Sequence, residues 1–476
     1  DRHNDGGAVR MKVLIAGQGS RLRKSAGDKK KRANHHCLVR CPTTGDTGRH
    51  AMLDAAPSVT LWCDPIKSGQ DNEARMSGTH RRGFLTRTRN AVAALCGAAA
   101  PLGLAVADTT KSQGAPNSGY GSRSRFETIR RWITPSRFPT STASWTPLGD
   151  LDGIITPSAL HYERHHGGVP DIDPATHELL VHGLVDRPLT FSLAELRRFP
   201  VTNRICFIEC SGNSYREWHG PGGADVQQTH GLTSCSQWSG VLLRTVLAEA
   251  GVQAEAQWVV AEGADGAAMT RSIPLAKCLD DVLLATAQNG EALRPEQGYP
   301  VRLLVPGYEG SISVKWLRRL KLTATPYYTR EETSKYTDLM PDGRAREFTF
   351  VMEAKSVITS PSAGQRLAGQ GFHEIRGLAW SGRGRITRVE VSTDGGRNWH
   401  EAELHGPVLP VCHTRFTLPW EWRGEATQLM SRATDETGYR QPTREELVAA
   451  RGSHSFYHYN AIQRWRVESD GSIRNV

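Results

Sequence analysis

Residues 203–214 read NRICFIECSGNS, a β-rich apolar run that reaches Cys210 and then passes into the turn-forming sequence Ser-Gly-Asn. A cysteine at the end of a buried strand is accessible from the turn, and the glycine lets a ligand approach the backbone closely. The pattern therefore indicates a nucleophile or a metal ligand at Cys210. The alternative is a structural cysteine, either buried or joined in a disulfide to Cys206 or Cys235.

The sequence around this run, residues 149–340, alternates short apolar stretches with helical patterns. Residues 189–200 carry a capping box, in which Ser192 precedes the helix and Glu195 stands three positions later. Residues 241–251 form an amphipathic pattern that ends at a glycine. This mixture predicts an α+β domain whose special residues lie on strand-ending turns.

Residues 345–476 change to strand patterns only. Short alternating runs are separated by proline and by the sequence Asp-Gly-Gly at 394–396, which is a strong hairpin signal. Many short strands with turns between them are typical of a β-sandwich.

The charge of the chain is confined to its first part. The 476 residues contain 59 Lys and Arg against 49 Asp and Glu, a net charge of +10. Residues 1–107 hold 18 of these basic and 8 of these acidic residues, so the remainder holds 41 of each. A neutral remainder excludes the nucleic-acid partner that a strongly basic chain would otherwise suggest.

Residues 76–107 have the order of an export signal, with a basic start, an apolar run and small residues before a cleavage site. Arg81 and Arg82, followed by Gly-Phe-Leu, resemble the twin-arginine signature. We therefore expect export to the periplasm by the twin-arginine route. The apolar run is short and is broken by glycine and proline, so no transmembrane segment is predicted. The alternative is a basic helix end that leads into a buried alanine-rich helix.

Two flanking segments have no clear periodicity. Met76 stands where the start of such a signal is expected, so residues 1–75 are interpreted as non-native sequence upstream of the true start. Residues 108–148 are rich in Ser, Thr, Pro, Gly and Arg and are predicted to be an arm or linker.

Several stretches around Cys210 resemble the sulfite oxidase family of molybdenum enzymes. They are YERHHGGVPDID at 162–173, FIECSGNS at 207–214, HGLTSCSQWSGV at 230–241 and GYPVRLLVPGYEGSISVKWL at 298–317. Within the family, TREETSKYTDLMPDG at 329–343 and YHYNAIQRW at 457–465 are most similar to sulfane dehydrogenases of thiosulfate-oxidising systems. The resemblance implies a molybdopterin-binding catalytic domain over 149–340 and an immunoglobulin-like dimerisation domain over 345–476.

The resemblance implies a cofactor with one molybdenum and one pterin, in which the thiolate of Cys210 binds the metal; soft thiolates suit such metals. A pterin pyrophosphate needs cations and bare backbone amides around it. The residues that match the family's cofactor contacts are Tyr162, Glu163, Arg164, His165, His166, Asp265, Gln297, Arg302, Ser313, Val314 and Lys315.

Three further residues are expected to act on the substrate. Arg164 supplies charge at the metal face, and Arg271 lies where the family lines its pocket, although a plain surface charge is the alternative there. Tyr328 matches the active-site tyrosine by its distance from Lys315, with Tyr336 as the alternative.

The chain departs from the family at two places. Gln297 replaces a histidine among the cofactor contacts, which alters or removes that contact. Animal sulfite oxidases have paired arginines at the anion pocket, where this chain has Ser214 and Tyr215, followed by Arg216. The loss of a cation favours a sulfur substrate other than sulfite.

The sequence thus predicts a periplasmic molybdopterin oxidoreductase that acts on the sulfane sulfur of a persulfide on a carrier protein. No Cys-x-x-Cys-His is present to attach a haem, so a c-type cytochrome subunit is the expected electron acceptor, beside a homodimeric core. The alternatives are a sulfite dehydrogenase and a catalytically inactive exported binding protein, for which Gln297 is the hint.

Overall fold

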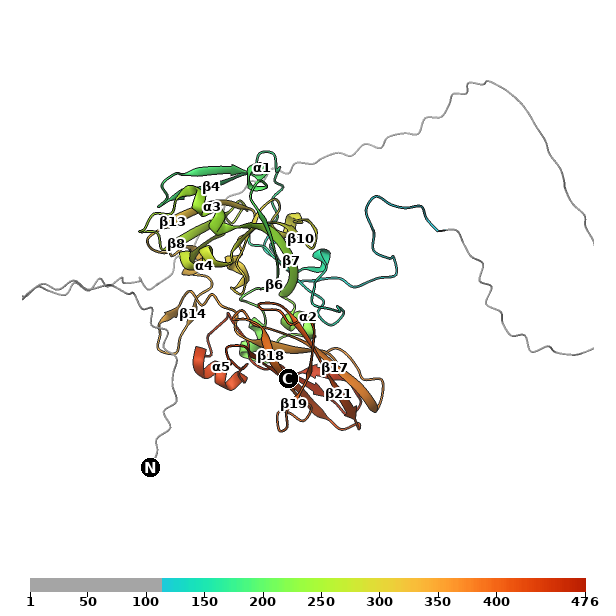
Figure 1. Cartoon of the computed structure of the whole chain (residues 1–476). Coiled ribbons are helices and arrows are strands. Elements are labelled where there is room, and N and C mark those ends of the chain that lie inside the picture. Colours follow the sequence, from blue (N-terminus) through green and yellow to red (C-terminus); the bar gives the residue numbers. More distant parts are fainter. Residues whose placement is uncertain (1–113) are drawn as a thin grey trace, which may run out of the picture. The chain divides into compact units, whose positions relative to one another are not determined.

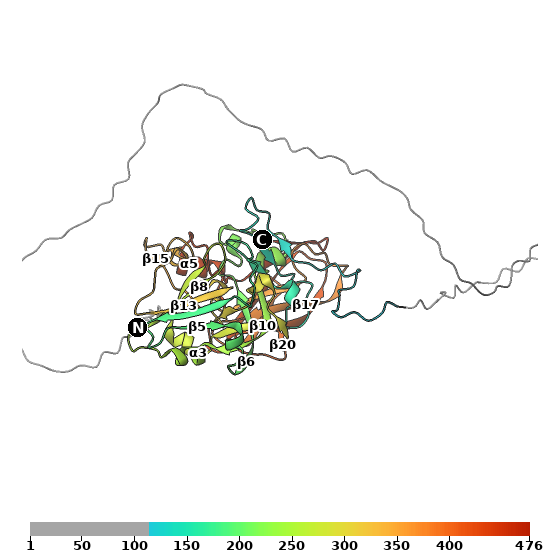
Figure 2. The ribbon, with the colours of Figure 1, turned by 90° about the horizontal axis from the view of Figure 1, so that it is seen from above.

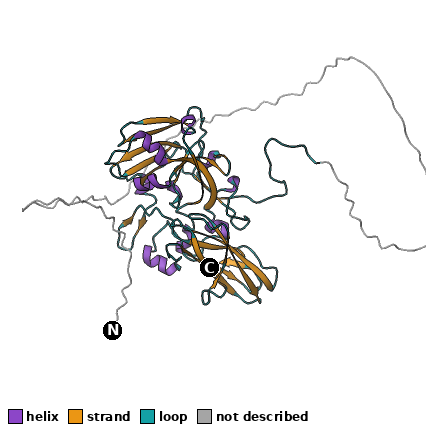
Figure 3. Ribbon diagram, in the orientation of Figure 1, coloured by secondary structure: helices purple, strands orange, loops and turns teal. Residues whose placement is uncertain are grey.

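The computed structural model describes residues 114–476, which belong to one compact unit. The predictions for residues 1–75 and 76–107 lie outside this part of the chain. Strands dominate the described residues, and the helices are few and short (Figure 3). None of the helices in residues 114–476 has the length and apolar character that a membrane span requires.

Two sheets and a pair of helices build the first domain (Figure 1). The first sheet has the order β5-β4-β13-β8-β9, and the second has the order β11-β10-β7-β6, with β12 paired to β10. The strands are β4 (Glu178–Gly183), β5 (Leu189–Ser192), β6 (Val201–Glu209), β7 (Thr233–Leu242), β8 (Trp258–Gly263), β9 (Thr270–Pro274), β10 (Leu283–Gln288), β11 (Glu291–Ala292), β12 (Arg302–Leu304) and β13 (Leu317–Thr323). Helices α3 (Leu243–Ala250) and α4 (Leu275–Asp280) pack against each other and against the first sheet.

The capping-box helix predicted within residues 189–200 is present but short. Ser192 caps it as expected, and α1 covers Leu193–Leu196. The residues before it pair with β4 as strand β5. The second predicted helix is confirmed as α3, and it stops at Gly251, whose positive φ of 70° suits glycine.

The second domain is a β-sandwich, as predicted. Its sheets have the orders β16-β17-β21-β20 and β19-β18-β22-β23-β24. The strands are β16 (Lys355–Ser360), β17 (Gly371–Trp380), β18 (Ile386–Ser392), β19 (His400–Glu401), β20 (Glu403–His405), β21 (Thr414–Trp422), β22 (Thr427–Asp435), β23 (Arg464–Val467) and β24 (Ile473–Asn475). The Asp-Gly-Gly turn joins β18 to β19, which pair antiparallel. The prediction of strands alone was wrong at α5 (Arg444–Arg451), whose capping box joins Thr443 and Glu446.

The two domains share one hydrophobic core. Phe207 and Cys235, from β6 and β7, lie in the same buried cluster as Trp380 and Phe416 of the sandwich. The backbone N–H of Phe207 also donates to the carbonyl of Val411 at 3.0 Å, so β6 lies directly against the second domain (Figures 1 and 2). Neither domain can bury this surface without the other.

Shorter elements complete the first domain and its border with the second. A small sheet has the order β1-β2-β3, and β14 pairs with β15. These elements are β1 (Trp132–Ile133), β2 (Ala143–Trp145), β3 (Glu163–Arg164), α2 (Val226–His230), β14 (Asp338–Leu339) and β15 (Ala345–Arg346), and the 3-10 helices are η1 (Ser158–Leu160), η2 (Tyr215–His219), η3 (Pro295–Gln297), η4 (Gly310–Ile312) and η5 (Arg330–Glu332). Because β2 pairs with β3, the end of the predicted arm lies beside the first cofactor stretch.

Candidate active site

Cys210 stands at the first position after β6, where the chain turns. Its N–H donates to the Leu232 carbonyl at 2.9 Å, and its carbonyl accepts from the N–H of Asn213 at 2.8 Å, which closes the turn. A Cβ added at Gly212 would lie 3.8 Å from the Cys210 sulfur, so glycine keeps this side of the thiol open. All five cysteines among residues 114–476 are free, so the disulfide alternative is wrong in this structure.

A buried carboxylate fixes the turn that carries Cys210. Glu209 is fully buried and accepts from Asn213 Nδ2 at 2.9 Å, from Lys355 Nζ at 3.0 Å and from Trp380 Nε1 at 2.6 Å. Lys355 also donates to the Ser214 hydroxyl at 3.0 Å. Lys355 and Trp380 belong to the sandwich, so the second domain holds the Cys210 turn in place.

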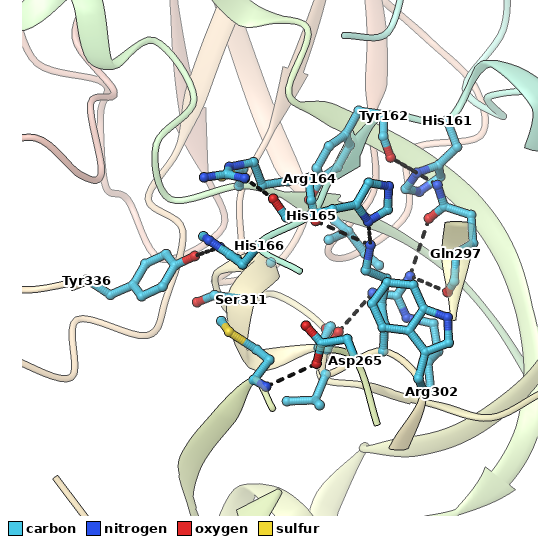
Figure 4. Close-up of a pocket in the computed structure, with 18 residues that line it drawn as sticks. His161, Tyr162, Arg164, His165, His166, Asp265, Gln297, Arg302, Ser311 and Tyr336 are labelled. Atoms are coloured by element: carbon cyan, nitrogen blue, oxygen red, sulfur yellow. Dashed lines mark hydrogen bonds between the residues drawn. The ribbon is translucent and has the colours of Figure 1, made fainter. Parts of the chain in front are cut away.

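Cys210 lines a pocket, whose lining residues are drawn in Figure 4. Its lining brings together nearly all of the residues predicted to contact a cofactor: Tyr162, Arg164, His165, His166, Asp265, Gln297, Arg302, Ser313, Val314 and Lys315. Glu163 is the exception, since it pairs with Arg131 and with His165 Nε2 at 2.7 Å instead of lining the pocket. In Figure 4, Gln297 and Arg302 lie on one side of the group and Tyr336 on the other.

The pocket carries an excess of buried positive charge. Arg164, Arg302 and Lys315 line it, while Asp265 is the one carboxylate among the described lining residues. Burial, and then the neighbouring charge of Arg302, lowers the pKa of Lys315 to about 7. Burial lowers the pKa of Arg302 to about 10, and its Nε is buried without a hydrogen-bond partner. These cations fit an anionic, phosphate-bearing cofactor, which would supply the missing negative charge.

Gln297 links Tyr162 to Arg302 through hydrogen bonds of its side chain. Its Nε2 donates to the Tyr162 carbonyl at 3.0 Å, and its Oε1 accepts from Arg302 at 3.4 Å. Arg302 also donates to the Ser313 carbonyl at 2.9 Å. The glutamine that departs from the family pattern thus ties the first cofactor stretch to the arginine, and the site is assembled despite the replacement.

Two histidines connect the cationic side to the opposite side of the pocket. The Nδ1 of His165 lies 2.9 Å from Lys315 Nζ, and Nε2 of His166 lies 2.8 Å from the hydroxyl of Tyr336. Burial, and then Arg164, lowers the pKa of His166 to about 3. The His166 ring is therefore neutral at neutral pH and can exchange a hydrogen bond with the tyrosine hydroxyl.

The structure places Tyr336, and not Tyr328, in the pocket with Cys210. Tyr328 is 56% exposed and packs against Phe348 outside the pocket. Distance along the chain favoured Tyr328, but η5 turns the chain so that the later tyrosine faces inward. Burial raises the pKa of Tyr336 above its ordinary value, so its hydroxyl stays protonated.

Arg271 lies behind Tyr336 and outside the pocket lining. Its guanidinium sits 5.0 Å from the centre of the Tyr336 ring, and it is paired with Glu309 at 2.7 Å. Burial alone would raise the pKa of Glu309, but Arg271 and His458 hold that pKa at about 2. Arg271 is thus a buried positioning residue and not the surface charge that the sequence left as an alternative.

Three residues of this centre, Glu209, Lys355 and Trp380, were missed by sequence reasoning. Glu209 directly precedes Cys210, so a charged residue in an otherwise apolar strand was the signal that could have found it. Lys355 and Trp380 are more than 140 positions away in sequence and carried no such signal.

Comparison with known proteins identifies the arrangement. The model of the oxidoreductase molybdopterin binding domain matches residues 166–330, and that of the Mo-co oxidoreductase dimerisation domain matches residues 346–465. Chicken (Gallus gallus) sulfite oxidase is 34% identical over 319 residues, which cover 61% of this chain and 68% of that protein. The chain belongs to the sulfite oxidase family. It is a molybdopterin-dependent oxidoreductase that acts on sulfur groups.

Other members of the sulfite oxidase family are similar over different lengths. The crystal structure of the sulfane dehydrogenase SoxCD from Paracoccus pantotrophus matches with a TM-score of 0.76 and 48% identity, covering 77% of this chain and 96% of that one. A nitrate reductase from Hordeum vulgare is 33% identical over 342 residues, 61% of this chain and 37% of that protein. Membership in this family of enzymes, together with the assembled pocket, supports an enzyme over the alternative of an inactive binding protein.

Proposed function

We propose that the protein oxidises the sulfane sulfur of a persulfide carried on a cysteine of a carrier protein, as a sulfane dehydrogenase. The observation that carries this proposal is the anion side of the pocket. Arg164 is the arginine that lines both this pocket and the cleft that adjoins it at Cys210, whereas Arg216 donates to the Tyr215 hydroxyl at 2.9 Å and to the Gly222 carbonyl. Free sulfite would therefore meet one arginine directly beside Cys210, where the animal sulfite oxidases carry a pair.

The residues of the chain have separate tasks in this function. Cys210 is the ligand that would hold the metal, and Arg302 with Lys315 would bind the phosphate of the pterin. When bound, the molybdenum cofactor, with one pterin, would accept electrons from sulfur in pairs and release them as single electrons. Each oxygen atom that sulfur gains comes from one water molecule, which releases two protons, while the sulfur gives up two electrons.

Arg164 and Tyr336 face the substrate end of the pocket. Arg164 is positioned to attract the anionic terminal sulfur, while the protonated Tyr336, held by His166, can donate a hydrogen bond to an oxygen atom that sulfur gains. The electrons leave the protein for an external c-type cytochrome. The similarity to SoxCD and the match to a dimerisation domain support a homodimer core with cytochrome subunits. The export signal predicted at residues 76–107 supports a periplasmic location.

Sulfite oxidation is the second candidate, favoured by the retained Arg164 and by the similarity to chicken sulfite oxidase. The test compares the reduction of cytochrome c by free sulfite with that by a persulfidated carrier protein. We expect efficient reduction with the persulfide. Rapid turnover of sulfite, with none of the persulfide, would assign the second function. Molybdenum analysis of the same sample establishes that the enzyme is loaded.

A further inference from the structure

A second cleft, of about 440 Å³, opens outward from the Cys210 pocket. The cleft and the pocket share Arg164, His166, Cys210 and Tyr336. A molecule in the outer cleft can therefore reach Cys210 directly. Sites for small molecules occupy roughly 300–1,000 Å³. The outer cleft lies within this range, which is more room than a sulfite ion requires.

One wall of this cleft is a continuous row of aromatic side chains, Tyr215, Phe456, Tyr457 and Tyr336, here called the aromatic row. The ring centres lie 4.7 Å apart between Tyr215 and Phe456, 5.0 Å apart between Phe456 and Tyr457, and 5.1 Å apart between Tyr457 and Tyr336. The row begins at Tyr215, at the position where animal sulfite oxidases carry an arginine, and ends at the tyrosine of the inner pocket.

The row is supported from both domains. Phe456 and Tyr457 come from the end of the sandwich, and their N–H groups donate to Asp338 Oδ1 at 2.8 and 3.2 Å. A Cβ added at Gly212 would lie 3.6 Å from the Phe456 ring, so this ring lies next to the Cys210 turn. Phe456 is 44% exposed, so part of its ring remains accessible to a ligand.

The remaining lining is polar or positively charged. Arg164, Arg330 and Lys335 line the cleft, and none of its described lining residues is Asp or Glu. Uncharged residues of the 134–145 segment complete the lining: Thr134, Pro135, Ser136, Ser141, Thr142, Ala143 and Trp145. The cleft therefore combines an aromatic face, a positive potential and an uncharged segment.

We propose that the aromatic row selects sulfur carried on a peptide, by packing against the alkyl and backbone atoms that flank a cysteine persulfide; this rests on the proposed function. A small, fully hydrated oxyanion gains nothing from an aromatic face and must give up water to approach it. An extended peptide buries apolar atoms on the row, while its anionic sulfur is drawn to Arg164. The row thus discriminates by what carries the sulfur and not by the sulfur itself.

The test uses the molybdenum-loaded protein and three variants. Phe456→Ala removes the central ring of the row, Phe456→Leu keeps an apolar side chain there, and Phe372→Ala removes a ring that is 70% exposed on β17 as a matched control. Each is given a persulfidated peptide, cysteine persulfide and sulfite. We expect Phe456→Ala to lower kcat/KM for the peptide about tenfold relative to kcat/KM for sulfite, through KM, with Phe456→Leu lowering it less.

Equilibrium binding gives a readout apart from turnover. A short peptide whose cysteine carries an S-methyl disulfide serves as a probe, and its Kd is measured by calorimetry. We expect Phe456→Ala to weaken this binding about tenfold and Phe372→Ala to leave it unchanged. Because the Phe456 side chain is partly exposed, normal folding of the variant is expected and is checked by circular dichroism.

The outcomes separate this proposal from the proposed function. If the unmodified enzyme oxidises the peptide persulfide but Phe456→Ala lowers the peptide and sulfite values equally, the selective role of the row is refuted and the function stands. Equal kcat/KM for cysteine persulfide and the peptide in the unmodified enzyme also overturns the inference. Absence of any persulfide turnover refutes the proposed function itself.

Discussion

The contact between Lys355 and Glu209 offers the sharpest test of how the second domain acts on the active site. Both side chains are buried, with exposed fractions of 1% and 0%, and their N–O distance is 3.0 Å. Lys355→Met removes the charge and keeps the length of the side chain. Glu209 then keeps two neutral donors, Asn213 and Trp380, for a full negative charge.

The magnitude follows from burial. Removing one partner of a buried ion pair costs ~3–5 kcal/mol, because the other charge stays desolvated. Burial lowers the pKa of Lys355 although Glu209 opposes this shift, so keeping this ammonium buried already costs the folded protein free energy. Its removal recovers part of that energy, which places the expected loss near ~3 kcal/mol, a large share of the ~5–15 kcal/mol that stabilises a typical domain.

Urea unfolding followed by tryptophan fluorescence measures this loss. The double variant Lys355→Met/Glu209→Gln should be more stable than the sum of the two single changes by ~1–3 kcal/mol, because no unpaired charge remains. Arg366→Ala breaks an exposed pair with Asp470 and should leave the unfolding curve unchanged. A loss below ~1 kcal/mol in Lys355→Met would refute the reasoning, since it would mean that water or another cation reaches Glu209.

Three further predictions concern single residues. Cys210→Ser should keep the fold, as judged by circular dichroism, and abolish turnover; retained turnover would remove Cys210 from the metal. Tyr336→Phe should lower kcat by roughly 100-fold while Tyr328→Phe leaves it unchanged, and the reverse result would restore Tyr328 as the active-site tyrosine. Because the pKa of Glu309 is lowered from 4.5 to about 2, the stability that it contributes, about 3 kcal/mol, is fully present above pH 4.5 and is lost as the pH falls towards 2. Glu309→Gln should therefore flatten the loss of stability between pH 4.5 and pH 2 in urea unfolding, and an unchanged slope would contradict the assignment.

Local sequence patterns predicted the parts of the site that depend on neighbours in the chain. The apolar run before Cys210 is a strand, and the Asp-Gly-Gly turn closes a hairpin. These two features follow from period-two alternation and turn chemistry, and they need no knowledge of how distant strands pack. The meeting of the cofactor stretches from Tyr162 to Lys315 in one pocket was instead implied by the family resemblance.

The parts that could not be predicted depend on contacts across the fold. Tyr336 faces the pocket because η5 redirects the chain, which spacing from Lys315 does not reveal. The stretch before α1, for which the sequence predicted no element of its own, becomes strand β5 because β4 offers it a partner. Glu209 is tolerated in a buried strand because Lys355 and Trp380 arrive from another domain.

The shared core and the Glu209 contacts have a consequence for exchanging parts between relatives. A chimera that joins the first domain of this chain to the sandwich of another family member would separate Glu209 from Lys355 and Trp380, and Phe456 from the turn at Gly212. Such a hybrid would need these side chains to be transplanted as a set across the junction. The two domains have therefore to be inherited, shuffled and engineered as one block, even though family models describe them as two.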